Sequence, residues 1–171
     1  ESVGVPMILT GPDIAPGRVE GAAVSHIDIY NSVLHAVGVP LEQSSASGRS
    51  RSLLSPVDHE RITLSEYHTI GSRAAVFMLQ DSRSKFVYYC DHPPELFDLE
   101  QDPEEMVNLA LRPESRDRLA FWEARLRALC DPEEVDRRAK RRQQELIDLY
   151  GGEEAIRTGT GIGGYTPSPL H

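Results

Sequence analysis

The sequence predicts a mixed α/β chain: a strand and a helix come first, a small four-stranded antiparallel sheet follows, and helices end the chain. Three observations indicate this order. A continuous apolar run covers residues 5–9, and a helical pattern begins at residue 25. Four short apolar runs separated by polar turns lie between residues 61 and 99. From residue 113 onward, apolar residues recur at helical spacing.

Length, charge and cysteine content limit the classes of protein that fit. The 171 residues suffice for one domain with a sizeable core, and 13 Gly with 12 Pro indicate many loops. A net charge of −9 disfavours binding to nucleic acid or anionic membranes. No apolar run approaches the roughly 20 residues that span a bilayer. No signal peptide is visible, but the sequence begins at Glu1 without Met, so a leader upstream of residue 1 is an open alternative. The two cysteines favour a reducing, cytoplasmic setting, with Cys90 and Cys130 as small buried apolar groups.

The first part of the chain predicts a strand, a helix and a loop. Residues 5–9 are apolar without interruption, which is typical of a strand buried on both faces. Ser25 is suited to cap the following helix with Asp28 as its partner in the first turn, and Gly38 ends the helix. Residues 42–60 are polar and rich in Ser, and predict an exposed loop. The expected apolar face of the helix consists of Ile27, Tyr30, Leu34 and Val37.

The middle of the chain predicts the antiparallel sheet. A polar turn at residues 81–84 separates two of the apolar runs, as in a hairpin. After the last run, Asp102 is expected to cap a short helical turn that begins at Pro103. The expected strands are residues 61–67, 74–79, 85–90 and 96–99.

The last third of the chain predicts two helices and an extended tail. Pro113 is suited to begin the first helix, and Asp131-Pro132 separates it from the second. Gly151-Gly152 ends the second helix, and residues 157–171 are rich in Gly and Pro. The expected apolar face of the first helix consists of Leu119, Trp122, Leu126 and Leu129.

An ordered set of segments resembles one known family. The strand and acidic turn "ELFDLE", "DPEE" and "NLA" within residues 94–110 form one of them. The others are residues 2–8, 11–17, 24–40, 65–68, 77–79, 85–89, 130–136, 151–156 and 164–169. Together they are similar to the C-terminal part of the sulfatases of the alkaline phosphatase superfamily, in particular the choline-sulfatase and phosphonate monoester hydrolase branch.

The resemblance implies a division of the chain into four parts. Residues 1–60 would end an alkaline-phosphatase-like α/β sandwich, which is the catalytic domain of the family. Residues 61–112 would form the small C-terminal antiparallel sheet, residues 113–156 a helical extension, and residues 157–171 a tail that contacts a neighbouring subunit. A homo-oligomer held through this tail is therefore expected.

The resemblance also implies that the chemistry lies outside this chain. The family hydrolyses sulfate, phosphonate or phosphate esters with a formylglycine made from the Cys of a C-x-P-x-R motif and with a divalent metal, calcium or manganese. No C-x-P-x-R motif is present, because Asp-His-Pro follows Cys90 and Asp-Pro-Glu follows Cys130. Neither catalytic nor metal-binding residues are therefore expected here, and the chain alone is expected to be inactive without a missing N-terminal catalytic portion. The alternative is a non-catalytic interaction module derived from this subdomain.

Glu66 and His68 are the residues expected to contact substrate. They flank Tyr67 at the end of a predicted strand, where side chains commonly reach a cleft. In the choline-sulfatase-like enzymes this region lies near the substrate, and a carboxylate there would attract a cationic alcohol head group. The alternative is that both residues only line a polar strand end.

Two further groups have simpler interpretations. His26 and Asp28 share a helix start and suggest a metal pair, but capping explains Asp28 better. The basic run at residues 137–142 suggests nucleic-acid binding. Acidic residues surround that run, so ion pairs along a solvated helix or with a neighbouring subunit explain it better.

Overall fold

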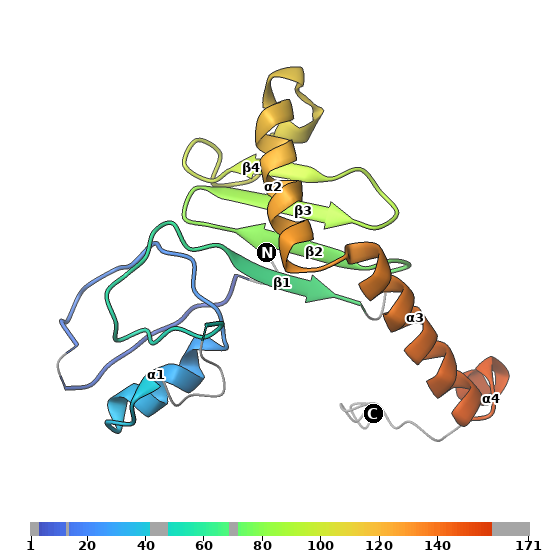
Figure 1. Ribbon diagram of the computed structural model, residues 1–171, viewed down its shortest axis with the longest axis horizontal. Coiled ribbons are helices and arrows are strands. Elements are labelled where there is room, and N and C mark those ends of the chain that lie inside the picture. Colours follow the sequence, from blue (N-terminus) through green and yellow to red (C-terminus); the bar gives the residue numbers. More distant parts are fainter. Residues whose placement is uncertain (1–3, 13, 42–47, 69–71, 159–171) are drawn as a thin grey trace, which may run out of the picture.

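The computed structural model describes residues 4–12, 14–41, 48–68 and 72–158 (Figure 1). Its centre is a four-stranded sheet in the order β1-β2-β3-β4, in which each strand pairs antiparallel with the next one in the sequence. This confirms the predicted antiparallel sheet. The strands are β1 (Thr63–Tyr67), β2 (Val76–Gln80), β3 (Ser84–Tyr89) and β4 (Glu95–Asp98).

Aspartate side chains stabilise the turns that follow β2 and β4. The Asp81 carboxylate accepts hydrogen bonds from the backbone N–H groups of Arg83 and Ser84, at 2.8 and 2.7 Å, and so closes the β2–β3 hairpin. Asp102 likewise accepts from the N–H of Met106 at 3.0 Å. A single hydrogen-bonded turn does begin at Pro103, since the N–H of Glu105 donates to the Asp102 carbonyl at 3.0 Å. No helix continues from it, because Glu105 adopts a left-handed φ of 56°.

The apolar core lies between the sheet and α2 (Arg116–Leu129), which crosses one face of the strands (Figure 1). Two short 3₁₀ turns, η2 (Leu109–Leu111) and η3 (Pro113–Ser115), lead into α2, so Pro113 does begin a helical segment. Leu129, predicted on the apolar face, is exposed. Cys90 and Cys130 are free thiols that pack partly buried against the core, as predicted, and burial raises the pKa of Cys90 to about 11. The buried core residues are Ala75, Phe77, Leu79, Phe86, Leu96, Trp122 and Leu126.

Two helices follow, α3 (Pro132–Leu149) and the short α4 (Glu153–Thr158). The Asp131 carboxylate caps α3 by accepting from the N–H of Glu134 at 3.0 Å. Gly151 and Gly152 follow α3 with φ of 91°, which confirms the predicted glycine stop. In Figure 1, α3 begins beside the end of α2 and runs away from the sheet.

The N-terminal part differs from the prediction at two points. Residues 5–9 form no strand, and Ile8 is 90% exposed, because no described strand lies beside them to bond their N–H and C=O groups. The predicted helix exists as α1 (Asp28–Ala36), but its apolar face is largely exposed. Its buried side chains are polar instead, namely Asp28, Asn31 and Ser32.

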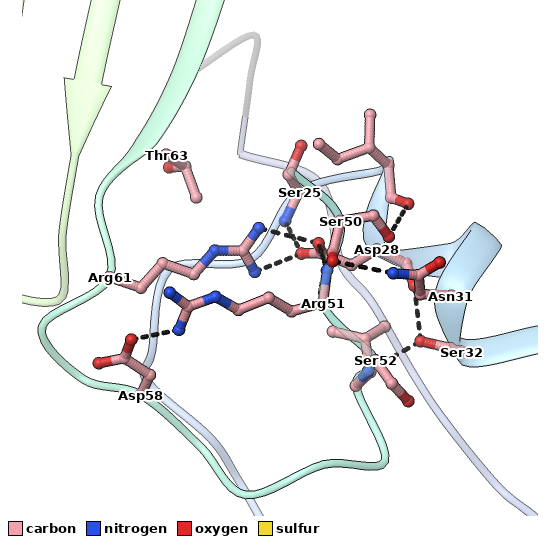
Figure 2. Close-up of polar contacts among 12 residues, drawn as sticks. Ser25, Asp28, Asn31, Ser32, Ser50, Arg51, Ser52, Asp58, Arg61 and Thr63 are labelled. Atoms are coloured by element: carbon pink, nitrogen blue, oxygen red, sulfur yellow. Dashed lines mark hydrogen bonds and ion pairs between the residues drawn. The ribbon is translucent and has the colours of Figure 1, made fainter. Parts of the chain in front are cut away.

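A polar cluster around Asp28 explains why α1 buries polar side chains and exposes apolar ones (Figure 2). The Asp28 carboxylate is fully buried and accepts two hydrogen bonds from the Arg61 guanidinium, at 2.6 and 2.8 Å. It also accepts from the N–H of Ser25 at 2.7 Å and of Arg51 at 2.9 Å. Ser25 therefore donates to Asp28 and is not the side-chain cap that was predicted. Burial raises the pKa of Asp28, but these hydrogen bonds outweigh it and hold the pKa below its ordinary value.

The loop before β1 packs on α1 through the same cluster. Ser50 donates its hydroxyl to the carbonyl of Ile27 at 2.7 Å, and Asn31 donates to the carbonyl of Ser50 at 2.9 Å. Ser50 and Ser52 are buried, which corrects the predicted exposure of the loop at these two residues. Residues 42–47 of that loop lie outside the described residues. The cluster is thus a structural joint between α1 and the start of the sheet.

Candidate functional site

The candidate site is a groove between the end of β1 and α3, lined by the predicted site residues Glu66 and His68. Asp136 holds α3 beside the sheet. The Asp136 side chain is buried and accepts from the N–H of Ala75 at 2.8 Å and from Lys140 Nζ at 2.7 Å. Burial raises the pKa of Asp136, but the Lys140 and Ala75 hydrogen bonds outweigh it and lower the pKa overall. Gln143 Nε2 also donates to the carbonyl of His68 at 2.5 Å. Two turns of α3 are therefore anchored to the sheet.

A second anchor holds the start of α3. The Glu133 carboxylate accepts from the Tyr88 hydroxyl at 2.5 Å and from Arg127 at 2.9 and 3.1 Å. The Arg127 guanidinium also lies 5.5 Å from the centre of the Tyr88 ring. The Arg127 and Tyr88 hydrogen bonds lower the pKa of Glu133 to about 2, while burial and Glu133 raise the pKa of Tyr88 to about 12. The two anchors together fix the direction of α3 relative to β1.

The groove that results is open to solvent and has a volume of about 510 Å³. Glu66 and His68 line it from the end of β1, and Val135 and Ala139 line it with apolar side chains from α3. Glu66 Oε2 lies 3.0 Å from His68 Nε2, and the His68 ring meets the Phe77 ring edge-on at 5.5 Å. The buried His68 Nδ1 has no hydrogen-bond partner among the described residues. The structure thus brings the two predicted site residues together in one groove.

Basic side chains of α3 complete the groove. Arg138, Arg141 and Arg142 line it, together with Glu145, and Arg142 pairs with Glu145 at 3.1 Å. Sequence reasoning missed these arginines as part of the site, because it interpreted the run 137–142 as a solvated helix face. Their i, i+3 and i+4 spacing was the available signal, since residues so spaced share one helix face.

The other predicted candidates do not gather into a site. His26 is exposed, whereas Asp28 is buried in the structural cluster of Figure 2. His35 Nδ1 lies 2.9 Å from the Ser52 hydroxyl. Among the residues that the structure describes, no three His, Cys, Asp or Glu side chains converge as a metal site, and no helix is long and apolar enough to cross a membrane.

His92 lies in a separate, second groove. Its Nδ1 is 2.7 Å from the neighbouring Asp91, and its ring meets the Tyr89 ring edge-on at 6.3 Å. The Tyr89 hydroxyl donates to Glu95 at 2.9 Å. The groove also contains Arg73. Burial together with Glu95 raises the pKa of Tyr89 to about 12, so this hydroxyl stays a neutral donor.

Comparison with known proteins shows to which proteins this chain is similar, and over which share of its length. Human arylsulfatase K is 35% identical over 124 residues, which are 65% of this chain and 23% of that protein. This chain is homologous to part of a sulfatase. The phosphonate monoester hydrolase of Silicibacter pomeroyi superposes with a TM-score of 0.53 and 27% identity, over 68% of this chain and 27% of the other. A Bacteroides thetaiotaomicron protein assigned to the sulfatases superposes with a TM-score of 0.51 at 23% identity, over 66% of this chain and 24% of the other.

These comparisons confirm the predicted relationship to the sulfatases and phosphonate monoester hydrolases. The Bacteroides structure shows that the fold is shared, since its sequence identity is too low to show more. The chain spans about a quarter of the length of the curated relatives that it matches. No protein-family profile matches the chain.

Proposed function

We propose that this chain is the C-terminal part of a sulfatase-like hydrolase that cleaves sulfate, phosphonate or phosphate esters. The observation that carries the proposal is the 35% identity with human arylsulfatase K over 124 residues. The formylglycine and the divalent metal, calcium or manganese, would belong to the rest of the protein. The residues described here do not fit such a metal centre, since no cluster of oxygen, nitrogen and sulfur ligands forms among them.

Within that protein the chain would complete the catalytic domain and wall the substrate pocket. Residues 5–9 are apolar and pair with no described strand, which fits a segment whose neighbouring strands belong to the rest of the catalytic sheet. The exposed apolar face of α1 supports the same role. Glu66 and His68 would contribute to substrate binding from the end of β1. No atom of this chain takes part in bond cleavage under the proposal.

The test is hydrolysis by the complete protein that contains this chain. Purified protein is assayed with aryl sulfate, phosphate and phosphonate esters, with and without a chelator. We expect turnover of at least one ester, loss of turnover with the chelator, and none by residues 1–171 alone. Absence of turnover of every ester by metal-loaded protein whose upstream sequence carries C-x-P-x-R would overturn the proposal.

A non-catalytic interaction module is the second candidate, and the exposed apolar face of α1 favours it equally. The two candidates differ in the coding sequence before residue 1. A C-x-P-x-R motif followed by acidic metal ligands supports the hydrolase, whereas a start codon immediately before residue 1 supports the module.

The role of Glu66 is tested by replacing it with Gln in the complete protein. The exchange removes the negative charge and weakens the contact with His68 Nε2. We expect KM to rise several-fold with little change in kcat, because the residue would bind substrate without touching the reacting atoms. Equal KM values for both proteins would exclude the role.

Oligomerisation through the tail also remains a proposal. The tail predicted from residue 157 lies, from residue 159 onward, outside the described residues. Removing residues 157–171 from the complete protein is expected to shift its sedimentation coefficient toward that of a smaller species. An unchanged sedimentation profile would place the subunit contacts elsewhere.

A further inference from the structure

The groove between β1 and α3 contains two cations, Arg138 and Arg141, that have no counterion among the residues that the structure describes. Arg137 pairs with Glu134 at 2.5 Å, Lys140 with Asp136 at 2.7 Å, and Arg142 with Glu145 at 3.1 Å. These pairs confirm the predicted ion pairs along α3. Arg138 and Arg141, which both line the groove, have no ion pair with any described residue. The unpaired charges of this basic run therefore lie on the groove side of α3.

The spacing of these exposed arginines destabilises α3 slightly. Arg141 and Arg142 lie three and four residues after Arg138, and like charges at these spacings destabilise a helix by a few tenths of a kcal/mol per pair. The whole chain carries a net charge of −9, so acidic residues are plentiful, yet none pairs with Arg138 or Arg141 among the described residues. Concentrated positive charge in an acidic chain is typical of a site for an anion.

The remaining side chains of the groove suit an anion better than a cation. Its two carboxylates are already engaged, Glu66 with His68 at 3.0 Å and Glu145 with Arg142 at 3.1 Å. The two free guanidinium groups offer planar pairs of N–H donors, which match the oxygens of a sulfate, phosphate or carboxylate. The cationic head group expected at Glu66 from the family resemblance would meet these arginines.

We propose that the groove between β1 and α3 binds an oxyanion group of a polyanionic ligand through Arg138 and Arg141. In the sulfatase-like hydrolase, this group is a second anionic substituent of the substrate, separate from the ester that is cleaved. That second statement rests on the proposed function, whereas anion binding by the groove does not.

The test measures binding separately from hydrolysis. Isothermal titration calorimetry is performed on the complete protein with sucrose octasulfate as the polyanion and with inorganic sulfate as the single group. The test variant is Arg138→Gln combined with Arg141→Gln. The exchanges Arg137→Gln and Arg157→Gln are combined as the control, because they remove the same total charge from exposed positions of α3 and α4 that do not line the groove.

We expect the test variant to bind sucrose octasulfate about ten-fold more weakly, the control to bind within about two-fold of the wild type, and added NaCl to weaken binding steeply. Circular dichroism confirms that both variants are folded. Equal losses in test and control would show a diffuse charge effect and overturn the proposal, as would no binding by the wild type. Tighter binding of single-stranded RNA than of sucrose octasulfate, with the same dependence on Arg138 and Arg141, would overturn it in favour of a nucleic-acid site.

Kinetics then connect the groove to the substrate. The test variant is expected to raise KM several-fold for a sulfated sugar that carries further sulfate groups, and to leave KM for an aryl monosulfate unchanged. An equal effect on both substrates would overturn the assignment to a second anionic group. Binding that depends on Arg138 and Arg141 in a protein that hydrolyses no ester would support the groove and overturn the hydrolase, so the two proposals fail separately.

Discussion

Asp28 shows, for a single residue, which contacts can be predicted from the neighbouring sequence and which cannot. Its position in the first turn of a helix was predicted from Ser25 and the helical spacing, and the carboxylate does bond the N–H of Ser25. Its main partner, Arg61, lies 33 residues away, and no local pattern indicates that pairing. The arginine turns a surface capping residue into the fully buried centre of a polar joint.

Replacing Asp28 with Asn should destabilise the chain strongly. The exchange leaves the Arg61 guanidinium almost buried without its counter-charge, and breaking a buried ion pair from one side typically costs about 3–5 kcal/mol. Thermal and urea unfolding of residues 1–171 measure the loss. Arg51→Ala is the matched control, because its side chain pairs with Asp58 on the surface and only its backbone N–H bonds Asp28. A cost below 1 kcal/mol for Asp28→Asn would show that the cluster does not stabilise the fold.

At the scale of elements, the sheet was predictable and the groove was not. The strands are short apolar runs separated by polar turns, and Asp81 closes its hairpin with bonds to residues two and three positions later. The groove depends on contacts such as Gln143 with His68, which are 75 residues apart. Helical spacing also identified which residues of α1 share a face, but not which face is covered, since that depends on neighbours outside the helix.

The anchoring of α3 through Glu133 should weaken at acid pH. Arg127 and Tyr88 lower the pKa of Glu133 from 4.5 to about 2, so its contribution to stability is complete above pH of about 4.5 and is lost as the pH falls toward 2. Glu133→Gln removes this titration. Wild type and variant should therefore differ in unfolding free energy at pH 7 and converge as the pH falls through this window.

Urea unfolding at several pH values between 7 and 2 measures this convergence. Glu123→Gln serves as the control, because Glu123 pairs with the same Arg127 at 3.0 Å and both residues belong to α2. A difference between wild type and Glu133→Gln that stays constant with pH would mean that the carboxylate does not act through its charge.

At the scale of the whole molecule, the apolar side chains of the sheet and α2 are buried, whereas many of those in the N-terminal part are exposed. The sheet and α2 enclose a core, whereas α1 lies apart from the sheet (Figure 1) and exposes half or more of Val33 and Val37. Ile8, in the apolar segment 5–9 that pairs with no described strand, is 90% exposed. Large exposed apolar areas of this kind typically mark surfaces that another part of a protein covers. Under the proposed function, the rest of the catalytic domain covers them.

This proposal predicts that Val33→Ser has different effects in two settings. In the complete protein Val33 would be buried, so its loss should cost about 1–2 kcal/mol, whereas in residues 1–171 alone the cost should stay below about 0.5 kcal/mol. Met106→Ser is the control, since Met106 is 80% exposed on the acidic turn and should matter little in either setting. Thermal unfolding of both variants in both proteins measures the four values. Equal small effects of Val33→Ser would mean that α1 keeps its apolar face in solvent, and would favour an interaction module in which a separate partner covers that face.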